Sequence, residues 1–174
     1  MQKINLIETQ RLFLYVYIVG KDIMKEIERK FLVKSTIFDV LKYLEPQKIT
    51  QGYVATQDGI TVRVRTKGTK GFLTVKGKTI GLSRDEYEYE IPYDEALEMT
   101  RKFCTKTIEK DRYELQLNEK KWEIDIFQGH LEGLILAEIE LSSEDEVIEL
   151  PAWVGEDVSL DTRYYNSNLI QNGI

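Results

Sequence analysis

Polar and apolar positions alternate with a period of two through most of the chain from residue 25 onward. This alternation is typical of strands that bury one face and leave the other polar. Short turn signals, Gln57-Asp58-Gly59 and Asn118-Glu119-Lys120, predict the hairpins between neighbouring strands. The pattern predicts strands over residues 26–32, 49–56, 61–66, 71–77, 84–91, 105–117, 121–128 and 134–141.

Helical signals are confined to four short segments. A helix is predicted over residues 36–44, ended by Glu45-Pro46, and a second over 94–102, opened by Pro92-Tyr93-Asp94. The run Ser142-Ser143-Glu144-Asp145-Glu146 predicts a helix start with its cap, and residues 161–170 predict a final helix. With no internal repeat or linker, the pattern predicts one α+β domain that is mainly β, with about eight antiparallel strands.

The first 23 residues stand apart from this pattern. Residues 11–19 form an apolar run, but a bilayer span needs about 18 apolar residues or more. The run also lacks the small-residue cleavage site of a signal peptide. Met24 and the charged strand after it read as a natural start. Residues 1–23 are therefore predicted to be an N-terminal extension, or a start codon assigned too early, with an extra strand or a partner-binding segment as alternatives. The domain itself is expected over residues 24–174.

Composition narrows the chemistry that the domain can carry. The chain has 174 residues, with 30 acidic and 24 basic side chains, and its net charge of −6 argues against nucleic acid as a partner. A single cysteine, Cys104, excludes an internal disulfide and favours a reducing, cytoplasmic compartment. A single histidine, His130, excludes a histidine-cluster metal site, so any metal must be held by oxygen atoms. No membrane association is expected.

The polar faces of the predicted strands are almost purely charged. Side chains at positions i and i+2 of a strand share a face, so each strand presents its charges in one direction. For any single strand, a solvated face of a one-sided sheet explains this pattern. All the strands together favour a closed eight-stranded antiparallel β-barrel, with the charges inside as a tunnel and the helices packed outside.

The charges themselves indicate what such a tunnel would hold. Burying about a dozen charges costs several kcal/mol each unless the charges are paired or hydrated, which favours a water-filled interior with a ligand. Guanidinium and ammonium groups suit a polyanion, and the basic set is Lys30, Arg63, Arg65, Lys76, Lys110 and Arg112. Carboxylates suit a hard divalent cation such as Mg²⁺, and the acidic set is Glu26, Glu28, Asp125, Glu138 and Glu140. The two sets together describe a metal–triphosphate site.

One family combines these features. Glu26-Ile27-Glu28-Arg29-Lys30 resembles the E-x-E-x-K signature of the CYTH superfamily, the triphosphate tunnel metalloenzymes. The resemblance runs from residue 25 to about residue 170 and is greatest to small bacterial inorganic tripolyphosphatases. It continues in order through Gln51-Gly52-Tyr53, Arg63-Val64-Arg65, Thr74-Val75-Lys76, residues 81–88, Glu109-Lys110-Asp111-Arg112-Tyr113, residues 122–127, residues 137–141 and residues 161–166.

The resemblance implies a role for each set. It implies that the six basic residues bind phosphates, and that Glu26, Glu28, Glu138 and Glu140, with Asp125 nearby, hold one or two Mg²⁺ or Mn²⁺ ions. It also implies that Lys110 and Tyr53 act in catalysis, by positioning or activating water.

Two further expectations come from charge alone. Burial and Arg112 would lower the pKa of Lys110 whereas nearby carboxylates would raise it, so the sequence leaves the direction open. The acidic residues of the strand at 84–91 are expected to balance the arginines rather than bind metal: Glu86, Glu88 and Glu90.

The resemblance predicts metal-dependent hydrolysis of inorganic tripolyphosphate or a related triphosphate. The alternatives are a class IV adenylate cyclase, which makes cyclic AMP and pyrophosphate from ATP, a thiamine triphosphatase, and a triphosphate-binding module without activity. The numerous carboxylates argue against the binding module, because a polyanion alone does not require them. The expected partner is a small-molecule triphosphate, and a homodimer remains an option.

Overall fold

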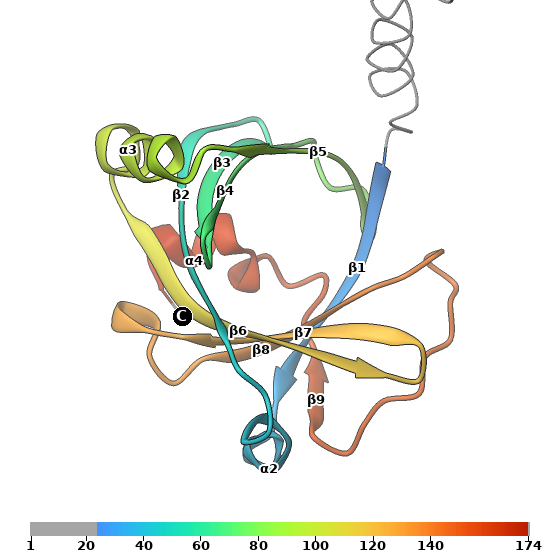
Figure 1. The fold of residues 1–174 in the computed structure, drawn as a ribbon. Coiled ribbons are helices and arrows are strands. Elements are labelled where there is room, and N and C mark those ends of the chain that lie inside the picture. The colour runs from blue at the N-terminus through green and yellow to red at the C-terminus, as the bar shows by residue number, and fades with distance from the viewer. Residues whose placement is uncertain (1–23, 174) are drawn as a thin grey trace, which may run out of the picture.

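A computed structural model describes residues 24–173, so the predicted N-terminal extension lies outside the described residues. No helix within the described range is long and apolar enough to cross a membrane. Nine strands are assigned in this range (Figure 1): β1 Met24–Val33, β2 Gln47–Gln57, β3 Ile60–Lys67, β4 Lys70–Lys76, β5 Ser83–Ile91, β6 Thr107–Leu117, β7 Lys120–Phe127, β8 Ile135–Glu140 and β9 Val154–Asp157.

The strands close into a ring. Their order is β5-β4-β3-β2-β6-β7-β8-β1-β9, every pair is antiparallel, and β1 also pairs with β5. The first half of β1, Met24–Ile27, pairs with β5, and Glu28–Leu32 pairs with β8, so one strand joins the two sides of the ring. Eight strands therefore close into a barrel, as predicted, and β9 lies outside it against the end of β1.

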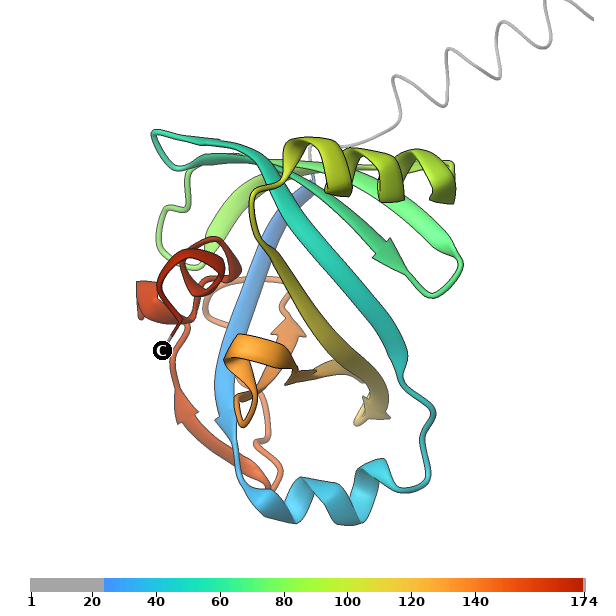
Figure 2. The same ribbon diagram turned by 90° about the vertical axis from the view of Figure 1, so that its left-hand side faces the viewer.

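The helices take different positions around the barrel (Figures 1 and 2). α3 (Tyr93–Phe103) packs on β2, β3 and β4 from outside. This close approach needs Gly71, because a Cβ there would lie 2.7 Å from the Cβ of Ala96. α4 (Asn166–Asn172) lies across one end of the ring. The predicted helix at 36–44 is a 3₁₀ turn, Ser35–Ile37, followed by α2 (Phe38–Leu41).

Two helix predictions in the C-terminal part need correction. The helix predicted to start at 142–146 is wrong: the Glu146 carboxylate accepts a hydrogen bond from the Ser142 backbone N–H at 2.6 Å and pairs with Lys120. This bond is made within a single turn, so the cap-like contact forms without a helix. The predicted helix at 161–170 is divided, because Tyr165 has an extended backbone (φ −71°, ψ 130°) between a 3₁₀ turn, Thr162–Tyr164, and α4.

Apolar side chains form two cores, one on each side of the barrel wall. The outer core contains Phe31, Ile124 and the ring of Trp122, which meets Trp153 edge-on with centroids 5.2 Å apart. Trp153 thereby packs the C-terminal segment onto the barrel. The second core joins residues of the barrel to residues of α4: Ile108, Phe127, Leu136, Leu169 and Ile170. It packs Leu169 and Ile170 of α4 against the barrel, while the start of α4 lines the charged part of the interior.

Candidate functional site: a charged tunnel

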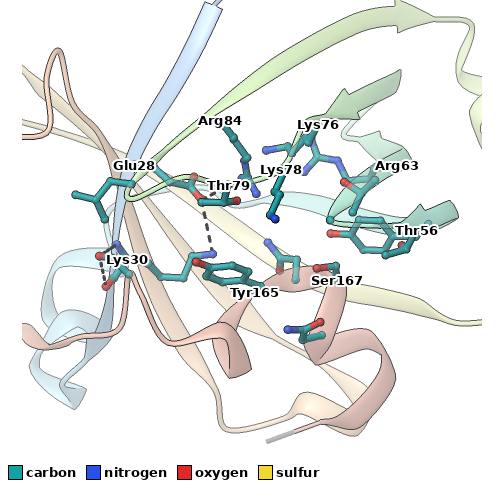
Figure 3. Close-up of a pocket in the computed structure, with 18 of the residues that line it drawn as sticks. Glu28, Lys30, Thr56, Arg63, Lys76, Lys78, Thr79, Arg84, Tyr165 and Ser167 are labelled. Atoms are coloured by element: carbon teal, nitrogen blue, oxygen red, sulfur yellow. Dashed lines mark hydrogen bonds and ion pairs between the residues drawn. The ribbon is translucent and has the colours of Figure 1, made fainter.

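Most of the predicted charged residues line a cavity inside the ring, whereas Lys110 and Asp125 lie behind its lining. Two spaces of about 380 and 300 Å³ have five lining residues in common, Glu28, Arg63, Lys76, Arg84 and Asn166, and so form one passage. Figure 3 shows the side nearer α4, where Arg63, Lys76 and Arg84 converge from the strands toward Tyr165 and Ser167 at the start of α4. The other side is lined by Arg65, Arg112 and most of the predicted carboxylates.

Two arginines of β3 share one carboxylate. Arg63 Nη2 donates to Glu88 Oε2 and to Thr74 Oγ1, both at 3.1 Å. Arg65 Nη2 lies 3.0 Å from both oxygens of Glu88. The Nε atoms of both arginines are buried and have no hydrogen-bond partner within residues 24–173. Glu88 therefore balances the arginines, as expected from charge, while part of each guanidinium stays unsatisfied.

A second basic pair lies on β4 and β5. Lys76 Nζ contacts Glu26 at 3.0 Å and Glu86 at 3.1 Å. Arg84 donates from Nε to Glu26 at 2.5 Å and from Nη2 to Glu28 at 3.2 Å. The sequence-based set of phosphate-binding residues omitted Arg84, although its position two and four residues before the inward-facing Glu86 and Glu88 could have identified it.

Lys110, Arg112 and Asp125 form a buried cluster on β6 and β7. Asp125 is 0% exposed. Its carboxylate accepts hydrogen bonds from Lys110 Nζ at 2.5 Å, from Arg112 Nε at 2.6 Å and from Arg112 Nη2 at 2.5 Å. Both carboxylate oxygens are engaged by cations. This places Asp125 as the partner that orients Lys110 and Arg112.

The Lys110 ammonium is disfavoured by its surroundings. Burial lowers its pKa and Arg112 lowers it further, against the opposing effect of Asp125 and Glu138, so the pKa of Lys110 falls to about 8. The sequence left this direction open, because it gives the neighbours but not the degree of burial. A substantial fraction of Lys110 is therefore a neutral amine near pH 8.

Glu138 lies between two cations on the same wall. Its Oε1 is 2.9 Å from Lys30 Nζ and its Oε2 is 2.8 Å from Arg112 Nη2. Burial acts to raise the pKa of Glu138, but Lys30, Arg112 and Lys110 outweigh it and hold the pKa well below its usual range. Burial likewise acts to lower the pKa of Lys30, and Glu138 and Glu28 outweigh it, so that pKa is raised. Both groups remain charged at neutral pH.

The remaining predicted metal ligands gather on β1 and β8. Glu28 and Glu140 are direct partners in the register of these strands, with Glu26 and Glu138 two residues away on the same face. Burial raises the pKa of Glu28, and the charges of Glu26 and Glu138 raise it further. Within residues 24–173 no three acidic side chains form a ready metal-binding group. The donors are nevertheless all carboxylate oxygens, and a divalent cation would relieve the like-charge repulsion that raises the pKa of Glu28, so the chemistry of these residues suits such a cation.

Tyr53 lies toward the α4 end of the tunnel. It is the register partner of Arg63 and lines the larger space. Burial raises its pKa, so the phenol stays protonated and can donate a hydrogen bond. The register partner of Lys110 on β2 is Ile49, four residues before Tyr53. Of the two predicted catalytic residues, Tyr53 therefore lines the tunnel, whereas Lys110 lies behind its lining.

Comparison with known proteins gives consistent matches. The CYTH domain family model matches residues 24–169. An inorganic triphosphatase of Acetivibrio thermocellus is 48% identical over 150 residues, covering 85% of this chain and 94% of the relative. An inorganic triphosphatase of Nitrosomonas europaea is 41% identical over 150 residues, covering 84% and 97%. A solved structure of an inorganic triphosphatase has a TM-score of 0.59 at 35% identity, covering 83% of this chain and 93% of the other.

Proposed function

This chain belongs to the CYTH family, and from that premise we propose that it hydrolyses inorganic tripolyphosphate held in the charged tunnel. One water adds across a P–O–P bridge, and the products are pyrophosphate and orthophosphate. The observation that carries the proposal is the pair of buried, incompletely bonded guanidiniums of Arg63 and Arg65 on the tunnel wall. Such groups bind phosphate oxygens through paired, charge-assisted hydrogen bonds.

Lys110 is proposed to accept the proton of the attacking water. As a neutral amine, it would donate one N–H to Asp125 Oδ2 and turn its lone pair to the water. Arg112, fixed by the same carboxylate, adds positive charge close to this point. Tyr53 would donate a hydrogen bond from its phenol toward the other end of the substrate. Phosphoryl transfer depends mainly on such positioning and charge stabilisation.

The carboxylates of β1 and β8 are proposed to hold Mg²⁺ or Mn²⁺: Glu26, Glu28, Glu138 and Glu140. A bound cation would neutralise part of the negative charge of the phosphates. Asp125 is left out of this set because its side chain is fully buried and lines neither of the two spaces, whereas all four glutamates line the second. Lys76 and Arg84 pair with Glu26 and Glu28, and they would be available to phosphates once a cation takes their place.

Product analysis tests the reaction itself. Tripolyphosphate with Mg²⁺ or Mn²⁺ is expected to yield orthophosphate and pyrophosphate in equal amounts, and ATP to yield only slower release of orthophosphate. Without the cation both rates are expected to fall to background. Pyrophosphate and cyclic AMP from ATP would instead identify a cyclase. Binding of tripolyphosphate without turnover would identify a binding module.

Replacement of Arg63 tests where the substrate binds. Arg63→Ala is expected to raise KM for tripolyphosphate about 10- to 100-fold, the range for loss of a charge-assisted hydrogen bond of about 1.5–3 kcal/mol. Arg163→Ala is a matched control, because the Arg163 side chain is 74% exposed and pairs with Asp161. Steady-state kinetics of both variants give the comparison. Equal KM values for Arg63→Ala and the unaltered protein would place the substrate elsewhere.

A further inference from the structure

Glu88 of β5 occupies the place where the proposed function puts a phosphate. Its two oxygens accept hydrogen bonds from Arg63, Arg65 and the hydroxyl of Thr74, at distances between 2.8 and 3.1 Å. The side chain is 29% exposed and lines the tunnel, so it is accessible to an entering ligand. A carboxylate and a phosphate offer guanidinium groups the same kind of acceptor.

The bonding of the arginines shows that this arrangement is incomplete. Arg112 donates to Asp125 through both Nε and Nη2, and Arg84 donates through Nε to Glu26 and through Nη2 to Glu28. Arg63 and Arg65 reach Glu88 through Nη2 alone, which leaves both Nε atoms buried without a partner within residues 24–173. Buried donors without partners are uncommon in native proteins, and here they lie beside the ligand-binding space.

A third unsatisfied group lies on the adjacent strand. Gln51 of β2 is fully buried, and neither its amide nitrogen nor its amide oxygen has a hydrogen-bond partner within the described residues. Gln51 is the register partner of Arg65, so the two side chains extend from paired strands on the same face. An amide oxygen can accept a hydrogen bond from a guanidinium N–H.

We propose that Glu88 is an internal anion that competes with the substrate for Arg63 and Arg65, and that Gln51 becomes the partner of Arg65 once a triphosphate displaces Glu88. This inference rests on the proposed function, because it assumes that phosphates bind these arginines. A ligand with several negative charges displaces one carboxylate readily, whereas a ligand with few charges does not. Glu88 thereby selects polyphosphates over orthophosphate and limits inhibition by that product.

The Glu88→Gln variant tests the competition. Without the carboxylate charge, the variant is expected to bind tripolyphosphate about 3- to 10-fold more tightly in calorimetry without added metal, the scale of one partly solvated ion pair. Inhibition by orthophosphate is expected to strengthen by at least the same factor. Glu90→Gln is the matched control, because Glu90 lies on the same strand but pairs with Lys70 at the surface. Weaker binding in Glu88→Gln would show that Glu88 positions the arginines, and unchanged binding would show that it does not compete; either result overturns the proposal.

The Gln51→Leu variant independently tests whether Gln51 becomes the partner of Arg65 when a triphosphate binds. Loss of the amide is expected to raise KM about 3- to 10-fold with little change in kcat. Thermal stability is expected to stay the same or rise, because an unsatisfied buried amide is replaced by an apolar group of similar size. A purely structural role of Gln51 would instead lower stability and leave KM unchanged. If Arg63→Ala raises KM while both of these variants fail their expectations, the present inference is wrong and the proposed function stands.

Discussion

Replacing Lys110 with arginine is expected to lower kcat by about 10²- to 10⁴-fold, the range attributed to a general base. Arginine keeps the positive charge and the donors toward Asp125, so phosphate binding through charge is retained. It cannot become neutral near physiological pH, so it cannot accept a proton from water. The kcat of Lys110→Arg under saturating tripolyphosphate is the measurement that checks this.

The pH profile separates a basic from an electrostatic role of Lys110. With a pKa of about 8 in the folded protein, the amine is protonated below this pH and neutral above it. If the neutral form is the base, kcat/KM rises about tenfold per pH unit below pH 8 and levels off above it. Ionisation of the substrate affects both enzymes equally, so the ratio of unaltered protein to Lys110→Arg isolates the contribution of Lys110. That ratio is expected to increase with pH up to about 8.

Lys70→Arg provides the control, because Lys70 pairs with Glu90 at the surface, with both side chains more than half exposed. Calorimetric binding of tripolyphosphate shows whether the tunnel of Lys110→Arg is intact. A Lys110→Arg variant with near-normal kcat and an unchanged pH profile would mean that Lys110 acts as a phosphate-binding cation only.

Period-two alternation was sufficient to predict the barrel strands, because a strand with two different faces imposes that period over its whole length. The predicted strand at 49–56 corresponds to β2, Gln47–Gln57, and the others agree similarly. β9, Val154–Asp157, has only four residues, and its pairing with β1 near Phe31 and Val33 is a tertiary contact that the local pattern does not contain. The helix predicted to start at 142–146 does not form; Glu146 accepts a hydrogen bond from the Ser142 backbone N–H and pairs with Lys120, which is distant in sequence.

The inward direction of the charges could be predicted, but not the partner of each charge. Alternation places Asp125 on the inner face and so groups it with the carboxylates proposed to bind metal. Its actual partners depend on the register of β6 against β7, which sets Arg112 directly opposite Asp125. The pKa of Lys110 has the same origin, because burial of the cluster is decided by neighbouring strands and by the apolar core beneath α4.

Glu28→Gln is expected to raise the Mg²⁺ concentration for half-maximal activity by at least about 10- to 100-fold. Losing a residue that only hydrogen-bonds to a metal ligand weakens metal binding by about 10- to 100-fold. Glu28 is proposed to bind the metal directly, so its loss should cost at least as much. The variant should fold without loss, because burial and the charges of Glu26 and Glu138 disfavour the ionised form of Glu28 and raise its pKa. Thermal unfolding of the metal-free variant is therefore expected at the same temperature or higher.

Glu138→Gln gives the comparison that separates metal binding from structure. Glu138 pairs with the buried cations Lys30 and Arg112, so its neutral replacement leaves two charges without their counter-ion. The metal-free Glu138→Gln variant is expected to unfold at a lower temperature, whereas Glu28→Gln is not. Added Mg²⁺ should raise the unfolding temperature of the unaltered protein, and this rise should be lost in Glu28→Gln. An unchanged rise in Glu28→Gln would remove Glu28 from the metal site, and the cation would then have to be held by the other carboxylates.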